Sequence, residues 1–273
     1  MSHKPAGVLL SGLMMLFCLT TLPSAKVHAE DRGGFSLGST RVIYDGSKKE
    51  ASVTVINSAK NAPFLAQSWV TEYAPGKKQP AMVTVINSAK NAPFLAQSWV
   101  TEYAPGKKQP AMAPFLVTPP LYRQDEGRNM LRIVRTGGQM PSDRESVFWL
   151  NVKAIPAMHE SLAGKNTLQF AYVLRVKLFY RPAGLSGDAS KAGDSLTFSR
   201  QGNTLLARNA SPYYITFNKL SVGGKDVKDA SSVMVPPKGE QRYTLPAGAT
   251  GHQVSFRTLN DYGGVLPQQT VTF

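Results

Sequence analysis

Cysteine is nearly absent from this chain of 273 residues: Cys18 is the only one, and it lies in an apolar N-terminal stretch. If that stretch is removed no thiol remains, which excludes disulfide bonds, cysteine metal ligands and cysteine nucleophiles. Stability must then come from packed hydrophobic cores. Roughly 244 residues would remain, which is enough chain for two ordinary domains.

The side chains that most enzymes need are also scarce. Two of the four histidines lie in the N-terminal stretch, and the others, His159 and His252, stand in turn-like contexts without a second ligand at a metal-binding spacing. The chain has no Gly-x-Ser-x-Gly elbow, phosphate loop or dinucleotide fingerprint. We therefore predict a protein that is not an enzyme and that uses no metal and no cofactor.

Acidic residues are in deficit, 17 against 31 lysines and arginines, which gives a formal net charge of +14. Such an excess can indicate a nucleic-acid surface. Here the basic residues are scattered, and the sequence has no arginine-rich arm and no basic-aromatic RNA-binding motif. We predict no nucleic-acid partner and expect acidic protein partners instead.

The N-terminal apolar run is shorter than the roughly 20 residues that a membrane-spanning helix needs. It extends over Val8–Leu22, follows Lys4 and precedes Val27-His28-Ala29, whose compact residues suit the −3 and −1 positions of a cleavage site. This arrangement predicts a signal peptide over residues 1–29 that is cleaved after Ala29. The alternative, an uncleaved anchor, is disfavoured by the short run, so we expect an exported chain with no stable membrane insertion.

What the chain does contain is an identical repeat: residues 53–82 and residues 83–112 have the same sequence. Structural repeats normally diverge and occur in three or more copies, so we interpret this pair as a recent in-frame duplication. Each copy holds two predicted strands joined by turn residues, and a sandwich has one place for that hairpin. Sequence leaves the choice open, with a slight preference for the second copy because it runs directly into the stretch that follows. The predicted strands are Val53–Asn57 and Phe64–Thr71, then Val83–Asn87 and Phe94–Thr101.

The rest of the chain consists of short predicted strands separated by turns, with no long segment of helical period beyond the N-terminal stretch. Leu185–Gly193 is rich in Gly, Ser, Ala and Asp, and it predicts a linker or hinge between residues 30–182 and 183–273. The pattern is typical of an all-β protein built from β-sandwiches. The further predicted strands are Phe35–Tyr44, Leu131–Arg135, Ser195–Arg200, Thr204–Asn209, Tyr213–Leu220, Ser232–Val235, Gln241–Leu245 and Gln253–Asn260.

Two strand-like runs rich in Val, Leu and aromatic residues are the most informative: Arg144–Pro156 and Leu168–Pro182. Alternation along the second run places residues 168, 170, 172, 174, 176 and 178 on one face. That pattern fits an ordinary sandwich strand. It fits equally well an edge strand whose bulky residues enter a groove in another protein, and alternation alone does not separate the two.

Together these runs closely resemble the last two strands of the first domain in PapD-like periplasmic chaperones, which assemble surface pili. The resemblance covers the mature chain apart from one repeat copy, and it implies two immunoglobulin-like β-sandwiches in a boomerang arrangement. It also implies that the second run completes an unfinished pilus subunit by donor-strand complementation, with Leu168, Phe170 and Tyr172 filling the groove. Such a chaperone works in the periplasm and delivers pilus (fimbrial) subunits to an outer-membrane usher.

The same resemblance implies roles for five charged residues. Two cations would hold the terminal carboxylate of the subunit: Arg41, in the pair Thr-Arg of the opening strand, and Lys177, in Lys-Leu-Phe-Tyr-Arg-Pro. A planar guanidinium fork and a second positive charge suit a carboxylate. Three structural charges would join the two domains: Glu145, Arg181 and Asp261.

The alternative function is a pilus subunit or adhesin of immunoglobulin-like fold. A subunit should carry its own donor extension and usually a cysteine pair, and neither is visible in the sequence. A secreted enzyme is a more distant alternative.

Overall fold

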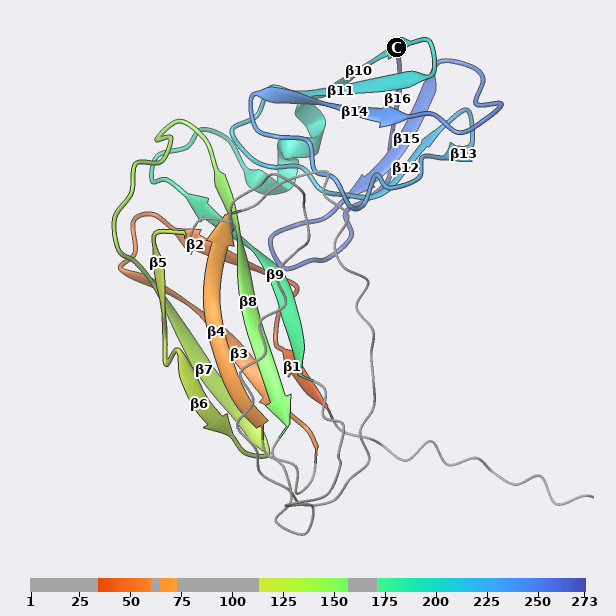
Figure 1. Ribbon diagram of the computed structural model, residues 1–273. Coiled ribbons are helices and arrows are strands. Elements are labelled where there is room, and N and C mark those ends of the chain that lie inside the picture. Colours follow the sequence, from red (N-terminus) through yellow and green to blue (C-terminus); the bar gives the residue numbers. More distant parts are fainter. Residues whose placement is uncertain (1–33, 60–63, 73–112, 157–170) are drawn as a thin grey trace, which may run out of the picture. The chain divides into compact units, whose positions relative to one another are not determined.

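The computed structural model describes residues 34–59, 64–72, 113–156 and 171–273 (Figure 1). Several predictions fall outside these residues: the signal peptide over residues 1–29, the strands of the second repeat copy, and the side chains of Leu168 and Phe170. These stay predictions. The described residues are built almost wholly of strands, which confirms the all-β fold class.

The first part of the chain forms a β-sandwich of two sheets (Figure 1). One sheet has the strand order β1-β3-β7-β5 and the other the order β2-β9-β8-β4-β6. The strands of the first sheet are β1 (Phe35–Leu37), β3 (Glu50–Asn57), β7 (Gly127–Arg135) and β5 (Phe115–Thr118). Those of the second sheet are β2 (Arg41–Asp45), β9 (Tyr172–Arg181), β8 (Ser146–Pro156), β4 (Phe64–Glu72) and β6 (Leu121–Gln124).

The opening strand that we predicted over Phe35–Tyr44 is divided in two. β1 pairs antiparallel with β3, whereas β2 pairs parallel with β9 in the other sheet. Gly38 lies at the break, where its N–H donates a hydrogen bond to the carbonyl oxygen of Thr54 (2.8 Å). The change of sheet matters for the site, because it brings Arg41, the first residue of β2, next to β9.

Both repeat-derived strands of this sandwich, β3 and β4, come from the first copy, so our preference for the second copy is wrong. β3 begins at Glu50, upstream of the repeat, and only the first copy follows the tight turn after β2. In that turn the N–H of Lys48 donates to the carbonyl oxygen of Asp45 (3.0 Å). The predicted hairpin is also wrong, because β3 and β4 belong to different sheets.

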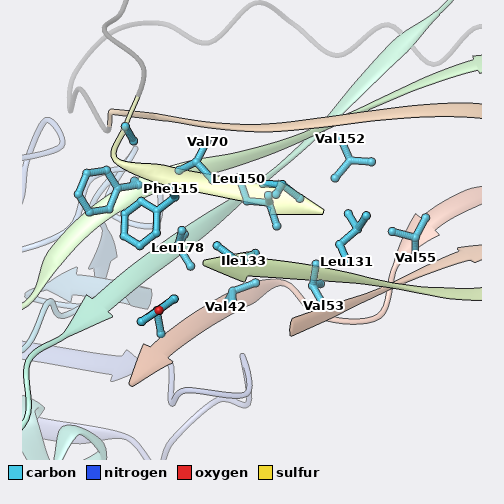
Figure 2. Close-up of a cluster of buried hydrophobic side chains, with 14 of the residues drawn as sticks. Val42, Val53, Val55, Val70, Phe115, Leu131, Ile133, Leu150, Val152 and Leu178 are labelled. Atoms are coloured by element: carbon cyan, nitrogen blue, oxygen red, sulfur yellow. The ribbon is translucent and has the colours of Figure 1, made fainter. Parts of the chain in front are cut away.

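The core of this sandwich lies between its two sheets (Figure 2). β3 and β7 supply valine, leucine and isoleucine from one side, and β4, β8 and β9 supply the other side. In β3 and β5 burial alternates along the strand, since one face of a pleated strand points into the core, whereas β8 is buried on both faces for most of its length. Residues with no exposed side-chain surface include Val55, Val70, Leu131, Leu150 and Leu178.

The second part of the chain forms another sandwich with its own core. Its sheets have the orders β10-β11-β14 and β13-β12-β15-β16. Aromatic rings fill the centre, where Phe217 and Phe256 are almost fully buried and contact each other edge to face, with ring centroids 5.7 Å apart. The strands are β10 (Leu196–Gln201), β11 (Thr204–Asn209), β14 (Gly239–Thr244), β13 (Lys225–Asp226), β12 (Phe217–Val222), β15 (Gln253–Thr258) and β16 (Gln269–Thr272).

The segment predicted as a linker is partly built into this second sandwich. Ala189–Ser195 forms a short 3-10 helix, η2, whose first turn is capped by the carboxylate of Asp188, which accepts from the N–H of Ser190 (2.8 Å). Ala192 and Gly193 are buried there. The small residues of this segment therefore serve close packing as well as chain reversal.

Two strand predictions in this part are wrong, and two strands were not predicted. Ser232–Val235 forms no strand, and only Val235 bridges to Ile215. The strand expected over Tyr213–Leu220 begins later and ends at Val222, and the strands β13 and β16 were missed. Within the described residues, no helix is both long and apolar enough to cross a bilayer, and no three His, Cys, Asp or Glu side chains gather as a metal site would require.

Candidate functional site

The two halves of β9 have different neighbours. From Tyr172 to Tyr180 the strand pairs antiparallel with β8 on one side. On the other side β2 pairs with it only from Lys177 onward, where Arg41 lies opposite. Among the residues that the structure describes, no strand pairs with that side of residues 173–176. Within the described part of the sheet, this stretch of β9 is therefore an edge, and a sheet edge is a template for adding another strand.

Large apolar side chains follow this open edge on the core-facing side of β9. Tyr172, Leu174 and Val176 are half-buried and pack against the first core, whereas Leu178 farther along the same face is fully buried. The hydroxyl of Tyr172 donates to the carbonyl oxygen of Phe35 (3.5 Å), and the two rings meet edge to face.

Of the three predicted groove-filling residues, Leu168, Phe170 and Tyr172, the structure describes only the last. It adds Leu174 and Val176 to the same partly covered face. The sequence shows the alternation of these side chains. It does not show that they are only partly buried, because their burial depends on the residue at which β2 begins.

Arg41 and Lys177 stand side by side where the open edge ends. They are direct partners in the parallel β2–β9 ladder, so their side chains project from the same face of the sheet. The guanidinium of Arg41 lies over the ring of Phe179, 5.7 Å from its centroid. Its Nε is buried without a hydrogen-bond partner among the described residues. The structure thus places the two predicted carboxylate-binding residues next to each other.

Burial and mutual repulsion make this pair of cations unfavourable in isolation. Burial, and then the neighbouring charge of Arg41, lower the pKa of Lys177 to about 8. Burial also lowers the pKa of Arg41, and the nearby Asp261 and Glu145 carboxylates partly oppose that effect. A bound anion would relieve both the repulsion and the unpaired Nε.

The two nearby carboxylates are already bound to Arg181, the last residue of β9. Its Nε donates to Glu145 (2.8 Å), and its two terminal nitrogens donate to the two oxygens of Asp261 (2.8 Å each). The other oxygen of Glu145 accepts from the N–H of Tyr214 (2.8 Å). The three charges that we predicted to join the domains are thus in direct contact, and they connect residues of the first sandwich with residues of the second.

This network is tightly held because most of it is buried. Burial raises the pKa of Glu145, although Arg181 and the N–H of Tyr214 oppose the effect. Burial acts to lower the pKa of Arg181, but its hydrogen bonds to Asp261 and the charge of Glu145 outweigh it, so that pKa is raised. The guanidinium also lies over the ring of Tyr213, 5.1 Å from the centroid. With both carboxylates engaged, the Arg41–Lys177 pair has no acidic partner within the part of the chain that the structure describes.

The turn that carries Asp261 also touches the strand that carries Arg41. Gly263 has a φ of 81°, and any Cβ atom there would collide with the hydroxyl of Thr40, the residue before Arg41. Only glycine combines that backbone conformation with such a close approach. The turn is closed by Asn260, whose side-chain oxygen accepts from the N–H groups of Tyr262 (3.0 Å) and Gly264 (2.8 Å).

Most of the chain matches two models of one protein family. Residues 34–81 and 72–186 match the N-terminal domain of the pili and flagellar-assembly chaperone PapD, and residues 191–270 match the C-terminal domain of the pili assembly chaperone PapD. The chain belongs to the PapD-like chaperone family. The N-terminal match comes in two overlapping stretches, as expected for a duplication within that domain.

Individual relatives agree with this assignment. The probable fimbrial chaperone LpfB of Escherichia coli O157:H7 is 43% identical over 233 residues, which cover 85% of each chain. The chaperone protein FimC of Escherichia coli K12 is 37% identical over 271 residues, which cover 98% of this chain and 94% of FimC. The crystal structure of the Escherichia coli chaperone DraB superposes with a TM-score of 0.66 at 33% identity, covering 88% of this chain and 98% of DraB.

A further solved structure shows such a chaperone with its guest. The SafB chaperone of Salmonella enterica, in complex with the SafA pilin, is similar to this chain with a TM-score of 0.67 at 29% identity, covering 88% of this chain and 96% of the other. Among the two functions left open by the sequence, these relatives support the chaperone over the pilus subunit or adhesin. The family is one of chaperones, not of enzymes.

Proposed function

We propose that this PapD-like chaperone holds an unfinished pilus subunit on the outer half of β9. The observation that supports the proposal is the coincidence of three features on one strand. Within the described residues, a backbone edge at residues 173–176, a partly covered apolar face and two cations without an acidic partner lie together on β9 and β2. Each is unfavourable in the free protein, and a single added strand would satisfy all three.

The direction of that added strand follows from the position of the cations. Arg41 and Lys177 lie at the inner end of the open edge, where β2 takes over as the neighbour of β9. A guest strand that runs parallel to β9 along residues 172–176 and then ends would bring its terminal carboxylate against both cations. Charge-assisted hydrogen bonds to Arg and Lys are among the strongest in proteins. The pair of cations thus sets the register in which the guest binds.

The apolar face supplies the rest of the interaction. Tyr172, together with Leu174 and Val176, would enter the groove of the subunit, and the predicted residues Leu168 and Phe170 would extend the row. Each large side chain that becomes fully buried contributes roughly 1.5–3 kcal/mol before ordering costs. Backbone pairing gives affinity, while the alternate side chains select the groove.

The remaining assignments concern the setting of this site. We assign Glu145, Arg181 and Asp261 a structural role in holding the two sandwiches together, outside the contact with the subunit. We further propose that the chain is exported through a signal peptide over residues 1–29 and acts in the periplasm, where an outer-membrane usher receives its pilus subunits. This function requires no cofactor and no catalytic residue.

The decisive experiment reverses one charge of the anion site. Lys177→Glu should abolish co-purification with a co-expressed pilus subunit, because a carboxylate would then face a carboxylate. The variant should keep its cooperative thermal unfolding, since Lys177 forms no ion pair with any of the described residues and its burial disfavours the cation. Lys228→Glu, an exposed lysine on the second sandwich, is the charge-matched control and should leave capture unchanged. Normal capture by Lys177→Glu would reject the proposed role.

A further inference from the structure

The repeat gives the first sandwich two candidate segments for one strand position. β4 lies between β6 and β8, and residues 94–102 have the same sequence as β4. Every pairing of β4, from Phe64 with Pro156 to Glu72 with Phe148, is therefore available to residues 94–102 with the same side chains. Packing within the sheet does not favour one segment over the other.

β3 does not have this freedom. It begins at Glu50, outside the repeat, and Glu50 pairs with Val134 and lies 3.9 Å from the guanidinium of Arg132. If the second copy supplied β3, Pro80-Ala81-Met82 would replace residues 50–52, and the proline would remove a backbone donor from the strand. The short turn after β2 would also become a long loop. The first copy therefore keeps β3.

With β3 fixed, exchange at β4 only moves the surplus chain from one loop to another. In the structure the β3–β4 connection spans residues 58–63 and the β4–β5 connection spans residues 73–114. If residues 94–102 formed the strand, the connections would span residues 58–93 and residues 103–114. Closure entropy grows only with the logarithm of loop length, so the arrangement with residues 64–72 is favoured by only about twofold.

We propose that the β4 position is occupied by either of two segments, residues 64–72 or residues 94–102, and that the folded population contains both forms. The inference rests on the identical sequences and on the ladder, and it does not depend on the partner of the protein. In both forms β8 pairs with a strand of the same sequence, and β9 is unchanged. Either segment can therefore take the β4 position when the other is disrupted.

A pair of matched substitutions tests this redundancy. Val70 has no exposed surface and lies beside Leu150 in the core (Figure 2). Aspartate there would place an uncompensated charge in an apolar interior, which a marginally stable domain does not tolerate. Val70→Asp alone should still fold, because residues 94–102 take the position, and Val100→Asp alone should fold as well. The double variant should fail to fold.

The readout is cooperative thermal unfolding of the monomer after size-exclusion chromatography. Val55→Asp in β3 is the control for a strand without a replacement, and it should fail to fold although residue 85 is still valine. Failure of Val70→Asp, with Val100→Asp unaffected, would overturn the proposal by tying β4 to the first copy. Rescue found only in a dimeric fraction would also overturn it, in favour of exchange between molecules. A double variant that folds would also overturn the proposal, since it would show that the β4 position does not need valine in either segment.

Disulfide trapping measures both forms without disturbing the core. Gln67 lies directly opposite Lys153 in the β4–β8 ladder, and Gln97 is its counterpart in the second copy. Gln67→Cys and Gln97→Cys, each combined with Lys153→Cys, should form disulfides in yields that differ by about twofold. Glu72→Cys with Lys153→Cys is out of register and should remain reduced. Absence of the Gln97→Cys disulfide would contradict the proposal.

Discussion

The inner and outer halves of β9 share one alternating sequence but differ in what covers them. In the inner half, β2 and β8 flank the strand, and Leu178, Phe179 and Tyr180 are all buried. In the outer half only β8 is paired with it among the described residues, and Tyr172, Leu174 and Val176 are half-buried. The inner half of β9 is therefore part of the core of its own sandwich, and we expect the outer half to bind a guest.

The boundary between the halves is set by the start of β2, not by any change within β9. Arg41 is the first residue of β2, and its partner Lys177 is the first residue of the covered half. The position at which the open edge ends therefore also carries two positive charges, those of Arg41 and Lys177. Substitutions in the two halves should consequently separate the stability of the chaperone from its capture of subunits.

The largest effect on stability is expected at Leu178. This side chain has no exposed surface, and Leu178→Ala would leave a cavity in the first core. Losses of about 2–5 kcal/mol in the free energy of unfolding are usual for such a change. Urea denaturation of the protein without a subunit measures it. A loss below about 1 kcal/mol would show that the inner half is not the structural part of the strand.

A smaller loss of stability, with a larger loss of binding, is expected at Leu174. Because this side chain is only half-buried in the free protein, Leu174→Ala should lower the free energy of unfolding by about 1 kcal/mol. The same change should weaken capture of a subunit about tenfold or more, since the burial gained in the complex is lost. Titration of a purified subunit, compared with Leu178→Ala, provides the contrast. Equal losses at both positions would remove the distinction between the halves.

A further effect, on the pH dependence of stability, is expected at the boundary residue Lys177. The pKa of Lys177 is about 8 in the fold, below its ordinary value near 10.5, so the unfolded chain binds more protons between these values. The free energy of unfolding of the free chaperone should therefore rise as the pH increases through that window. Capture of a subunit should change in the opposite sense and weaken above pH 8, because the carboxylate needs the charged lysine. Lys177→Met should flatten both pH profiles, measured by chemical denaturation and by co-purification.

The sequence allowed the site to be predicted where its motifs carry the resemblance to the family. That resemblance implies one network of Glu145, Arg181 and Asp261, and the structure brings all three into contact. Arg41 and Lys177 were likewise assigned to one site and lie opposite each other. Short motifs suffice here because each charge is fixed by the strand or turn that immediately surrounds it.

Other features depend on relations that no local pattern contains. The break between β1 and β2 follows from pairing with two different sheets, and a continuous run of strand-forming residues does not reveal it. The incomplete cover of Leu174 and Val176 depends on the length of a distant strand. The choice between repeat copies is the limiting case, since identical residues carry no information, and for β3 only flanking residues such as Glu50 decide it.

The close approach of Gly263 to Thr40 has a consequence for how such a protein can change its guests. Because that glycine touches the residue just before Arg41, a methyl group added in the second sandwich would shift the arginine that we expect to grip the guest's chain end. We therefore expect that substitution of Gly263 changes which guests are preferred. It would do so by shifting Arg41 slightly, without any change in the charge of that residue.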